Sequence, residues 1–463
     1  MNFIKINKYV ISFYTLLSVF FLYTTNIPFF WDNVIQVSVP ANWYYDNQFL
    51  SFFLPDNIAT GHPPLFAIYI AFVWKLLGKT LFVSHLAMVP FLFGLFYQLN
   101  RFISLFVSDF KYIFFILVFV LLDPTLLSQS SLVTFEIPYL FFFFLCINLI
   151  LRGKQISLSI AFLFLCLISL RGFISGIGVV FFVLLHFSKQ KNIIKIIIPF
   201  IPGVLALLVF LFIHYLSKGW FIHNTVSNEW PDARTLASLP SILKNFLVFN
   251  WALLDFGRIA IWITTLYVFI KSYKNKIVDK NCQTLIQLIC SQYIIFMLTT
   301  IFFNNTIGHR YLLPIIVLFS ILFCYLLIQR LNFKALIYSL LAFILISSNY
   351  IVYPEKKSQA WDASLAHWFY HDVRTEMISY LDENNISRES VGSFYPNLYQ
   401  DKYYFINENS KSFDKYDFHN HKYLLYSNVF NLSDRLIDQI NSNGIEIYNA
   451  TKNNVFIKLI KMH

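Results

Sequence analysis

Charged side chains are scarce in this chain. Asp, Glu, Lys and Arg make up 13% of its 463 residues, and 57% of the residues are hydrophobic. A soluble domain carries about 25% charged residues. The apolar residues lie in long runs that short basic clusters separate, which indicates a polytopic helical membrane protein.

Cysteine and glycine motifs are also missing. The five cysteines form no CxxC pair and no Cys/His metal spacing, so neither a disulfide framework nor a zinc site is expected. No glycine-rich phosphate loop occurs in the sequence. The net charge of +11 comes from basic residues between apolar runs. These residues indicate topology signals that face anionic lipid, and nucleic-acid binding is not expected.

The apolar runs predict a mainly α-helical bundle of about eleven transmembrane spans. The expected spans cover residues 9–28, 80–100, 112–127, 137–151, 156–171, 173–188, 194–216, 246–270, 283–303, 311–329 and 335–352. No small-x-small cleavage site follows the first run, so we expect it to be an uncleaved helix. The basic clusters then fall on one side, which is cytoplasmic by the positive-inside rule. The acidic residues of the opposite, outer side are Asp32, Asp46, Asp56, Asp123, Glu136, Glu229 and Asp232.

Residues 63–78 look like one more span, but counting them would place the later basic clusters outside. Only about 12 apolar residues precede Lys75, fewer than the roughly 20 needed to cross a bilayer. We therefore predict a helix on the outer leaflet, at the end of an outer loop over residues 29–79. Pro63 and Pro64 suit the first turn of such a helix.

The composition changes after Tyr353. Residues 1–353 are expected to form the membrane module, and residues 354–463 a small extracytoplasmic α/β domain without a span. In this domain we predict helices over 372–384 and 433–443. Strands are predicted over 391–395, 422–429, 446–449 and 454–460.

Several polar residues of the outer side are candidates for chemistry. Asp32 directly follows an aromatic triplet at the exit of the first span, where a carboxylate can accept the proton of a hydroxyl; it could also be an ordinary interfacial residue. His62, in Gly61-His62-Pro63-Pro64, could bind an acceptor or simply mark a helix start. Glu136 and Asp123 each flank a span and could cap a helix, but carboxylates at bilayer depth indicate a functional site.

Three arginines lie against apolar helices. Arg171 and Arg310 either extend to lipid headgroups or clamp a phosphate, which the planar guanidinium fits bidentately. Arg258 lies three residues after Asp255 in the eighth expected span. This spacing places the two on one helix face, and we predict a structural ion pair between them.

The order of these motifs resembles a family. WD in the first outer loop, GHPPL, DPTLLSQSSLVTFEIPY, SLRGFISG and a late HRYLLP follow one another over roughly residues 1–350. The chain resembles the GT-C superfamily of membrane glycosyltransferases, in the bacterial branch related to protein O-mannosyltransferases and aminoarabinose transferases. Where that family often has Asp-Glu in the first loop, this chain has Asp32-Asn33.

The resemblance implies a role for each matching residue. Asp32, with Glu136 and His62, matches the catalytic residues, while Arg171, Arg310 and Tyr311 match the residues that bind the donor phosphate. It implies transfer of a sugar, with inversion, from a polyprenyl-phosphate carrier to a hydroxyl of a glycan, lipid or protein, outside the bacterial cytoplasmic membrane. Some relatives hold a divalent cation, for which Asp32, Asp46 and Glu136 are the candidate ligands, and the resemblance implies no nucleotide site.

Three other functions stay open at this point. A transporter or flippase usually has charged residues and broken helices in repeated halves, and this sequence has no evident repeat. A lipid-linked polymerase or ligase of another family tends to carry its largest outer loop late. A non-catalytic scaffold would leave Asp32, His62 and Glu136 unconstrained.

Overall fold

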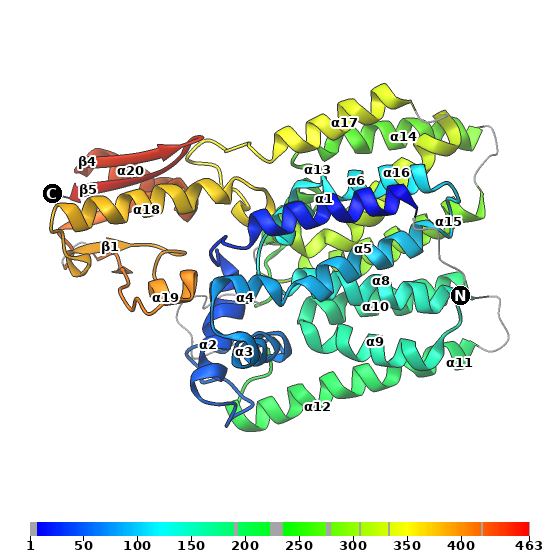
Figure 1. Ribbon diagram of the computed structural model, residues 1–463, viewed down its shortest axis with the longest axis horizontal. Coiled ribbons are helices and arrows are strands. Elements are labelled where there is room, and N and C mark those ends of the chain that lie inside the picture. The colour runs from blue at the N-terminus through cyan, green and yellow to red at the C-terminus, as the bar shows by residue number, and fades with distance from the viewer. Residues whose placement is uncertain are drawn as a thin grey trace.

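The computed structural model describes residues 7–188, 193–222, 235–274, 279–304, 307–331, 334–417 and 420–462. The expected outer residues Glu229 and Asp232 lie outside this set. The described chain is mainly helical, with a small sheet near its C-terminal end. Figure 1 shows the helices side by side in one bundle, with the sheet at one end of the molecule.

The bundle contains helices from the first 350 residues of the chain. Those before residue 189 are α1 (Lys8–Thr24), α2 (Val39–Asp46), α3 (Leu65–Leu77), α4 (Leu81–Leu86), α5 (Val89–Ile103), α6 (Phe110–Leu121), α7 (Pro124–Ser130), α8 (Glu136–Leu151), α9 (Gln155–Ile168) and α10 (Leu170–His186). Those after it are α11 (Ile193–Ile197), α12 (Ile201–Lys218), α13 (Leu239–Leu254), α14 (Arg258–Lys274), α15 (Lys280–Thr300), α16 (Leu313–Leu331) and α17 (Ala335–Ser348). The predicted surface helix corresponds to α3.

Among the described residues, length and apolar composition single out four helices that can each cross a bilayer, or six spans if two sharply bent helix pairs each count as one. The same part of the chain has six further apolar helices of 10–17 residues. The chain is therefore a multi-pass membrane protein, and the count of eleven spans stays a prediction. Two expected spans are not straight: the helix over 112–127 bends by 80° between α6 and α7, and that over 246–270 by 83° between α13 and α14.

Both bends have local causes. Asp123 accepts hydrogen bonds from the backbone N–H groups of Thr125 (3.0 Å) and Leu126 (3.2 Å), so it caps α7, which Pro124 opens. Between α13 and α14, Asp255 is extended, and Phe256 and Gly257 have φ of 52° and 77°. Since a left-handed pair cannot continue an α-helix, the chain turns there.

The C-terminal domain has one five-stranded sheet in the order β2-β1-β3-β5-β4. β1 pairs in parallel with β2 and β3, and β5 is antiparallel to β3 and β4. Its elements are α18 (His367–Glu383), β1 (Val391–Ser393), α19 (Asp401–Phe405), β2 (Asp414–Lys415), β3 (Tyr423–Ser427), α20 (Asp434–Asn443), β4 (Gly444–Lys452) and β5 (Val455–Met462). α18 packs against β4 and β5. The sequence did not predict α19 or β2.

Two hydrophobic cores exist, and the second joins the bundle to the sheet. The core of the C-terminal domain includes Phe30, which follows α1, and Leu132, which lies between α7 and α8. The Phe30 ring stacks on His367 (5.2 Å between centroids) and lies 5.6 Å from Tyr370, both in α18. The chain leaving α1 is therefore anchored in the C-terminal domain two residues before Asp32.

Candidate active site

Arg310 is the centre of a buried cluster where the bundle meets the C-terminal domain. It belongs to a short 3-10 helix, η3 (His309–Leu312), that leads into α16. Its Nη2 contacts Asp32 Oδ2, its Nη1 contacts Asp362 Oδ2, and its Nε lies 3.6 Å from Glu136 Oε1. All three guanidinium nitrogens thus face a carboxylate, and each carboxylate comes from a different part of the chain.

Arg171 completes the cluster from the first turn of α10. Ser169 caps this helix by accepting a hydrogen bond from the Gly172 backbone N–H (3.0 Å). Arg171 Nη1 contacts Oε1 of Glu136, which is the first residue of α8. The guanidinium carbon lies 3.7 Å from the ring centroid of Tyr311, a cation–π contact. The predicted residues Glu136, Arg171, Arg310 and Tyr311 therefore lie together.

Asp32 is held at the more open edge of this cluster. Its side chain is 20% exposed, whereas those of Glu136 and Arg310 are 1% and 5% exposed. Trp31, just before it, has φ of 54°, a strained value for a bulky residue, and packs edge-on against Tyr395. This geometry turns Asp32 toward Arg310 and leaves one carboxylate that a substrate can reach.

His62 lies beside Arg171. Its Nδ1 accepts a hydrogen bond from the Leu170 backbone N–H (3.4 Å), and its ring lies 5.4 Å from that of Phe135. If His62 is neutral, the acceptor at Nδ1 places its proton on Nε2. These contacts fix the start of α10, and a hydrogen bond from His62 to a substrate stays a prediction.

The C-terminal domain adds two residues that the sequence reasoning missed. Asp362 lies in η4 (Trp361–Ala363), between α17 and α18, and Tyr395 donates a hydrogen bond from its hydroxyl to Asp32 Oδ1 (2.9 Å). Burial raises the pKa of Tyr395 well above its usual range, and the Asp32 charge raises it further, so the hydroxyl keeps its proton. The sequence held one signal: the dipeptide Trp-Asp occurs twice, at Asp32 and Asp362.

Other acidic candidates do not join this cluster. Asp46 is exposed and pairs with Lys79 (3.3 Å), and Asp56 lies 3.7 Å from Lys218. Asp46 therefore does not combine with Asp32 and Glu136 as a set of cation ligands. Within the described ranges, no group of three or more His, Cys, Asp or Glu side chains is placed to hold a metal ion.

The predicted pair of Asp255 and Arg258 is wrong, because the helix breaks between them. Arg258 instead binds Asp123 with two hydrogen bonds, from Nε (2.6 Å) and Nη2 (2.8 Å). Asp255 binds His309 Nε2 (2.8 Å) and the Tyr353 hydroxyl. These residues form a second buried polar cluster directly beside Arg310, and we call it the hinge cluster because it joins the two helix bends.

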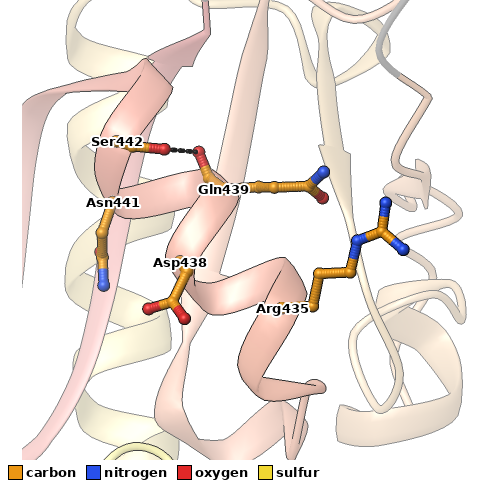
Figure 2. A pocket seen from close by; sticks show the side chains of 5 residues that line it. All are labelled: Arg435, Asp438, Gln439, Asn441 and Ser442. Atoms are coloured by element: carbon orange, nitrogen blue, oxygen red, sulfur yellow. Dashed lines mark hydrogen bonds between the residues drawn. The ribbon is translucent and has the colours of Figure 1, made fainter.

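A surface hollow also lies on α20, lined by Arg435, Asp438, Gln439, Asn441 and Ser442 (Figure 2). Its lining side chains are all exposed, and Asp438 pairs with Lys356 (2.5 Å). None of the residues around Arg310 lines it. The buried charges, and with them the candidate chemistry, belong to the cluster around Arg310.

The cluster can bind an anion and accept a proton. Two guanidiniums in a nearly dry site match the oxygens of a phosphate group, and they stabilise charge that develops on a leaving phosphate. Asp32, the partly exposed carboxylate, can take the proton of a hydroxyl that approaches from solvent. Asp362 is part of the same cluster through its contact with Arg310 Nη1.

Comparisons with known proteins give a distant likeness. No family model and no curated protein matches the chain. Two solved structures are similar: ArnT from Cupriavidus metallidurans bound to undecaprenyl phosphate (TM-score 0.46, 12% identity) and the same protein in the apo state (TM-score 0.46, 13% identity). Each likeness covers 69% of this chain, and this chain spans about 60% of ArnT. The chain is thus distantly similar to ArnT over part of that protein's length.

Proposed function

We propose that this chain is an inverting glycosyltransferase that moves a sugar from a polyprenyl-phosphate donor to a hydroxyl acceptor on the outer face of a bacterial cytoplasmic membrane. The observation that carries the proposal is the cluster itself, in which two buried arginines lie beside one partly exposed aspartate. Residues 1–353 would be the catalytic module, and residues 354–463 the extracytoplasmic domain that closes over it.

In the proposed reaction, the acceptor oxygen attacks the anomeric carbon while Asp32 takes its proton. The bond between that carbon and the phosphate oxygen breaks, and the phosphate leaves with the electron pair on the opposite face, which inverts the configuration. Arg310 and Arg171 stabilise the negative charge that grows on the phosphate, and Tyr311 holds the Arg171 guanidinium by its ring. Glu136 keeps the Arg171 guanidinium in place.

Asp32→Asn tests this proposal in cells that carry the variant as their sole copy. Loss of a general base lowers a rate by about 10²–10⁴-fold, so lipid extracts should accumulate polyprenyl-phosphate sugar, and its product should disappear from envelope glycans, lipids or proteins. Asp46→Asn is the matched control, since Asp46 is an exposed acid of the same outer loop. Mass spectrometry of both fractions checks the outcome. A variant that makes the product at the wild-type rate contradicts the role of Asp32.

A second assay, with the purified protein in detergent, distinguishes a transferase from a flippase. It would move a lipid-linked sugar without breaking its bond to phosphate, so no variant would change the ratio of lipid-linked sugar to glycosylated product in purified, one-compartment detergent assays. A transferase keeps its activity in detergent, and Asp32→Asn removes that activity.

A further inference from the structure

Asp362 occupies a position that the proposed reaction needs for another group. Its carboxylate contacts Arg310 Nη1, and its side chain is 5% exposed. A phosphate diester and a carboxylate both present two oxygens to a guanidinium, and they compete for the same N–H groups. All three nitrogens of Arg310 face carboxylates, and a phosphate can take the position on Nη1 only if Asp362 leaves it.

Asp362 is the carboxylate with the fewest other ties. Glu136 is also bound by Arg171, and Asp32 also accepts hydrogen bonds from Tyr395 (2.9 Å) and Gln36 (3.5 Å). Among the described residues, the polar contact of the Asp362 carboxylate is with Arg310 alone. Moving the Asp362 side chain away from Arg310 therefore breaks one ion pair. Moving Glu136 or Asp32 away breaks further hydrogen bonds or ion pairs as well.

The backbone around Asp362 can stay in place while its side chain turns. The Asp362 carbonyl accepts hydrogen bonds from Ser128 Oγ (2.7 Å) and Gln129 Nε2 (2.8 Å), both in α7. Thr125 Oγ1 donates to the next carbonyl, that of Ala363 (3.3 Å). These bonds hold η4 on the bundle, so exchange at Arg310 requires only a rotation about the side-chain bonds of Asp362 and no movement of the domain.

The charge balance favours the same exchange. The cluster contains the three carboxylates of Asp32, Glu136 and Asp362, and the two guanidiniums of Arg171 and Arg310. Adding an anionic phosphate to all five groups would place four negative groups beside two positive ones in a nearly dry site, which is costly. If Asp362 turns away, the phosphate replaces one negative charge with another, and the balance around Arg310 is kept.

We propose that Asp362 fills the phosphate position on Arg310 in the empty protein, and that the phosphate of a polyprenyl carrier binds by displacing it. This inference rests on the proposed function and extends it. Asp362 is then a specificity residue. A ligand binds Nη1 of Arg310 only if it replaces the Asp362 carboxylate, so this arginine does not strengthen the binding of a neutral lipid or a free sugar.

The test measures binding of undecaprenyl phosphate to the full chain in lipid nanodiscs, with uncharged undecaprenol as the reference ligand. Asp362→Asn and Asp362→Ala should each bind the phosphate about tenfold more tightly than wild type, if the carboxylate leaves Arg310 for about one tenth of the time in the empty protein. Affinity for undecaprenol should not change. Asp372→Asn is the matched control, because Asp372 is an exposed acid of the C-terminal domain that pairs with Lys452.

The outcomes separate the two proposals. If wild type binds the lipid phosphate and Arg310→Gln does not, while both Asp362 variants bind it no more tightly than wild type, the exchange is wrong and the proposed function stands. If wild type shows no preference for the phosphate over undecaprenol, both proposals fail. Should both variants unfold in a thermal melt, a structure of the wild-type complex decides: a phosphate on Arg310 with Asp362 turned away supports the exchange, and Asp362 still on Nη1 overturns it.

Discussion

His309 and Arg310 are neighbours in the chain, but their side chains enter two different buried clusters. His309 Nε2 lies 2.8 Å from Asp255 Oδ2 in the hinge cluster, while Arg310 contacts Asp32 and Asp362 at the candidate active site. Since both residues share one turn of η3, the hinge cluster sets the position of Arg310. The helix bends and the site are thus one connected structure.

Replacing His309 should therefore impair the site although His309 does not line it. His309→Gln removes a ring buried against Phe256 (5.0 Å between centroids) and the contact with Asp255. We expect weaker binding of undecaprenyl phosphate and a loss of transfer activity of about 100-fold, as a displacement near 1 Å produces in other enzymes. Tyr353→Phe removes one hydrogen bond at the other side of Asp255, and it should lower affinity and transfer activity less than His309→Gln does.

The measurement combines lipid-phosphate affinity with a thermal melt. A positioning role predicts that affinity falls in His309→Gln even at temperatures where the variant is fully folded. If the variant melts earlier but binds the lipid phosphate as wild type does, His309 is only a structural residue of the hinge cluster.

The junction between the bundle and the C-terminal domain should weaken at acid pH. Burial lowers the pKa of His367 to about 4 and that of His371 well below its usual value, and nearby Arg374 adds to the effect on His371. Both histidines are neutral when folded, whereas the unfolded chain binds protons at about pH 6.5. The two neutral histidines therefore contribute fully to the free energy of unfolding above pH 6.5. This contribution is lost as the pH falls toward 4, and for His367 the loss is about 3 kcal/mol.

Denaturant unfolding in detergent at pH 7 and pH 5, followed by tryptophan fluorescence, checks this dependence. In His367→Gln, the free energy of unfolding should differ less between pH 7 and pH 5 than in wild type, because a glutamine takes up no proton. If the free energy of unfolding differs between pH 7 and pH 5 by the same amount in wild type and variant, other groups control the acid sensitivity.

Gly257 should be intolerant of a side chain. Its φ of 77° favours glycine, and a Cβ there would lie 2.4 Å from Ile344 Cγ2 and 2.8 Å from Ser348 Oγ in α17. Gly257→Ala should destabilise the protein by more than the roughly 1–3 kcal/mol of backbone strain alone. Gly219→Ala is the matched control, since Gly219 has φ of 78° and open space around the added Cβ.

Thermal melts of the two alanine variants separate strain from collision. We expect Gly257→Ala to lower the midpoint further than Gly219→Ala and to reduce transfer activity, because the bend it supports holds Asp255. If the two variants melt at the same temperature, α17 moves away from the added methyl group without loss of stability.

The sequence predicted the elements with strong local patterns and the residues with unusual surroundings. Apolar runs gave the helices, and carboxylates or arginines next to such runs were rare enough that Asp32, Glu136, Arg171 and Arg310 stood out. These four do lie in one cluster. Local patterns suffice in such cases because a charge in an apolar setting needs a partner.

The features that the sequence missed depend on long-range geometry. The break at Asp255 was hidden because its cause is a left-handed pair inside an otherwise apolar run. Asp362 and Tyr395 were overlooked because they lie in a polar segment, where one more aspartate or tyrosine is unremarkable by composition. Their contacts with Arg310 and Asp32 depend on how the C-terminal domain packs against the bundle, with Phe30 in its core.

The distribution of the cluster along the chain has a consequence for biosynthesis. Asp32 is made early, Arg310 much later, and Asp362 and Tyr395 later still. A growing chain that has already inserted most of its helices therefore carries an arginine without its full set of partners. The cluster is complete only after the ribosome has passed Tyr395, so a nascent or prematurely ended chain lacks part of the candidate site.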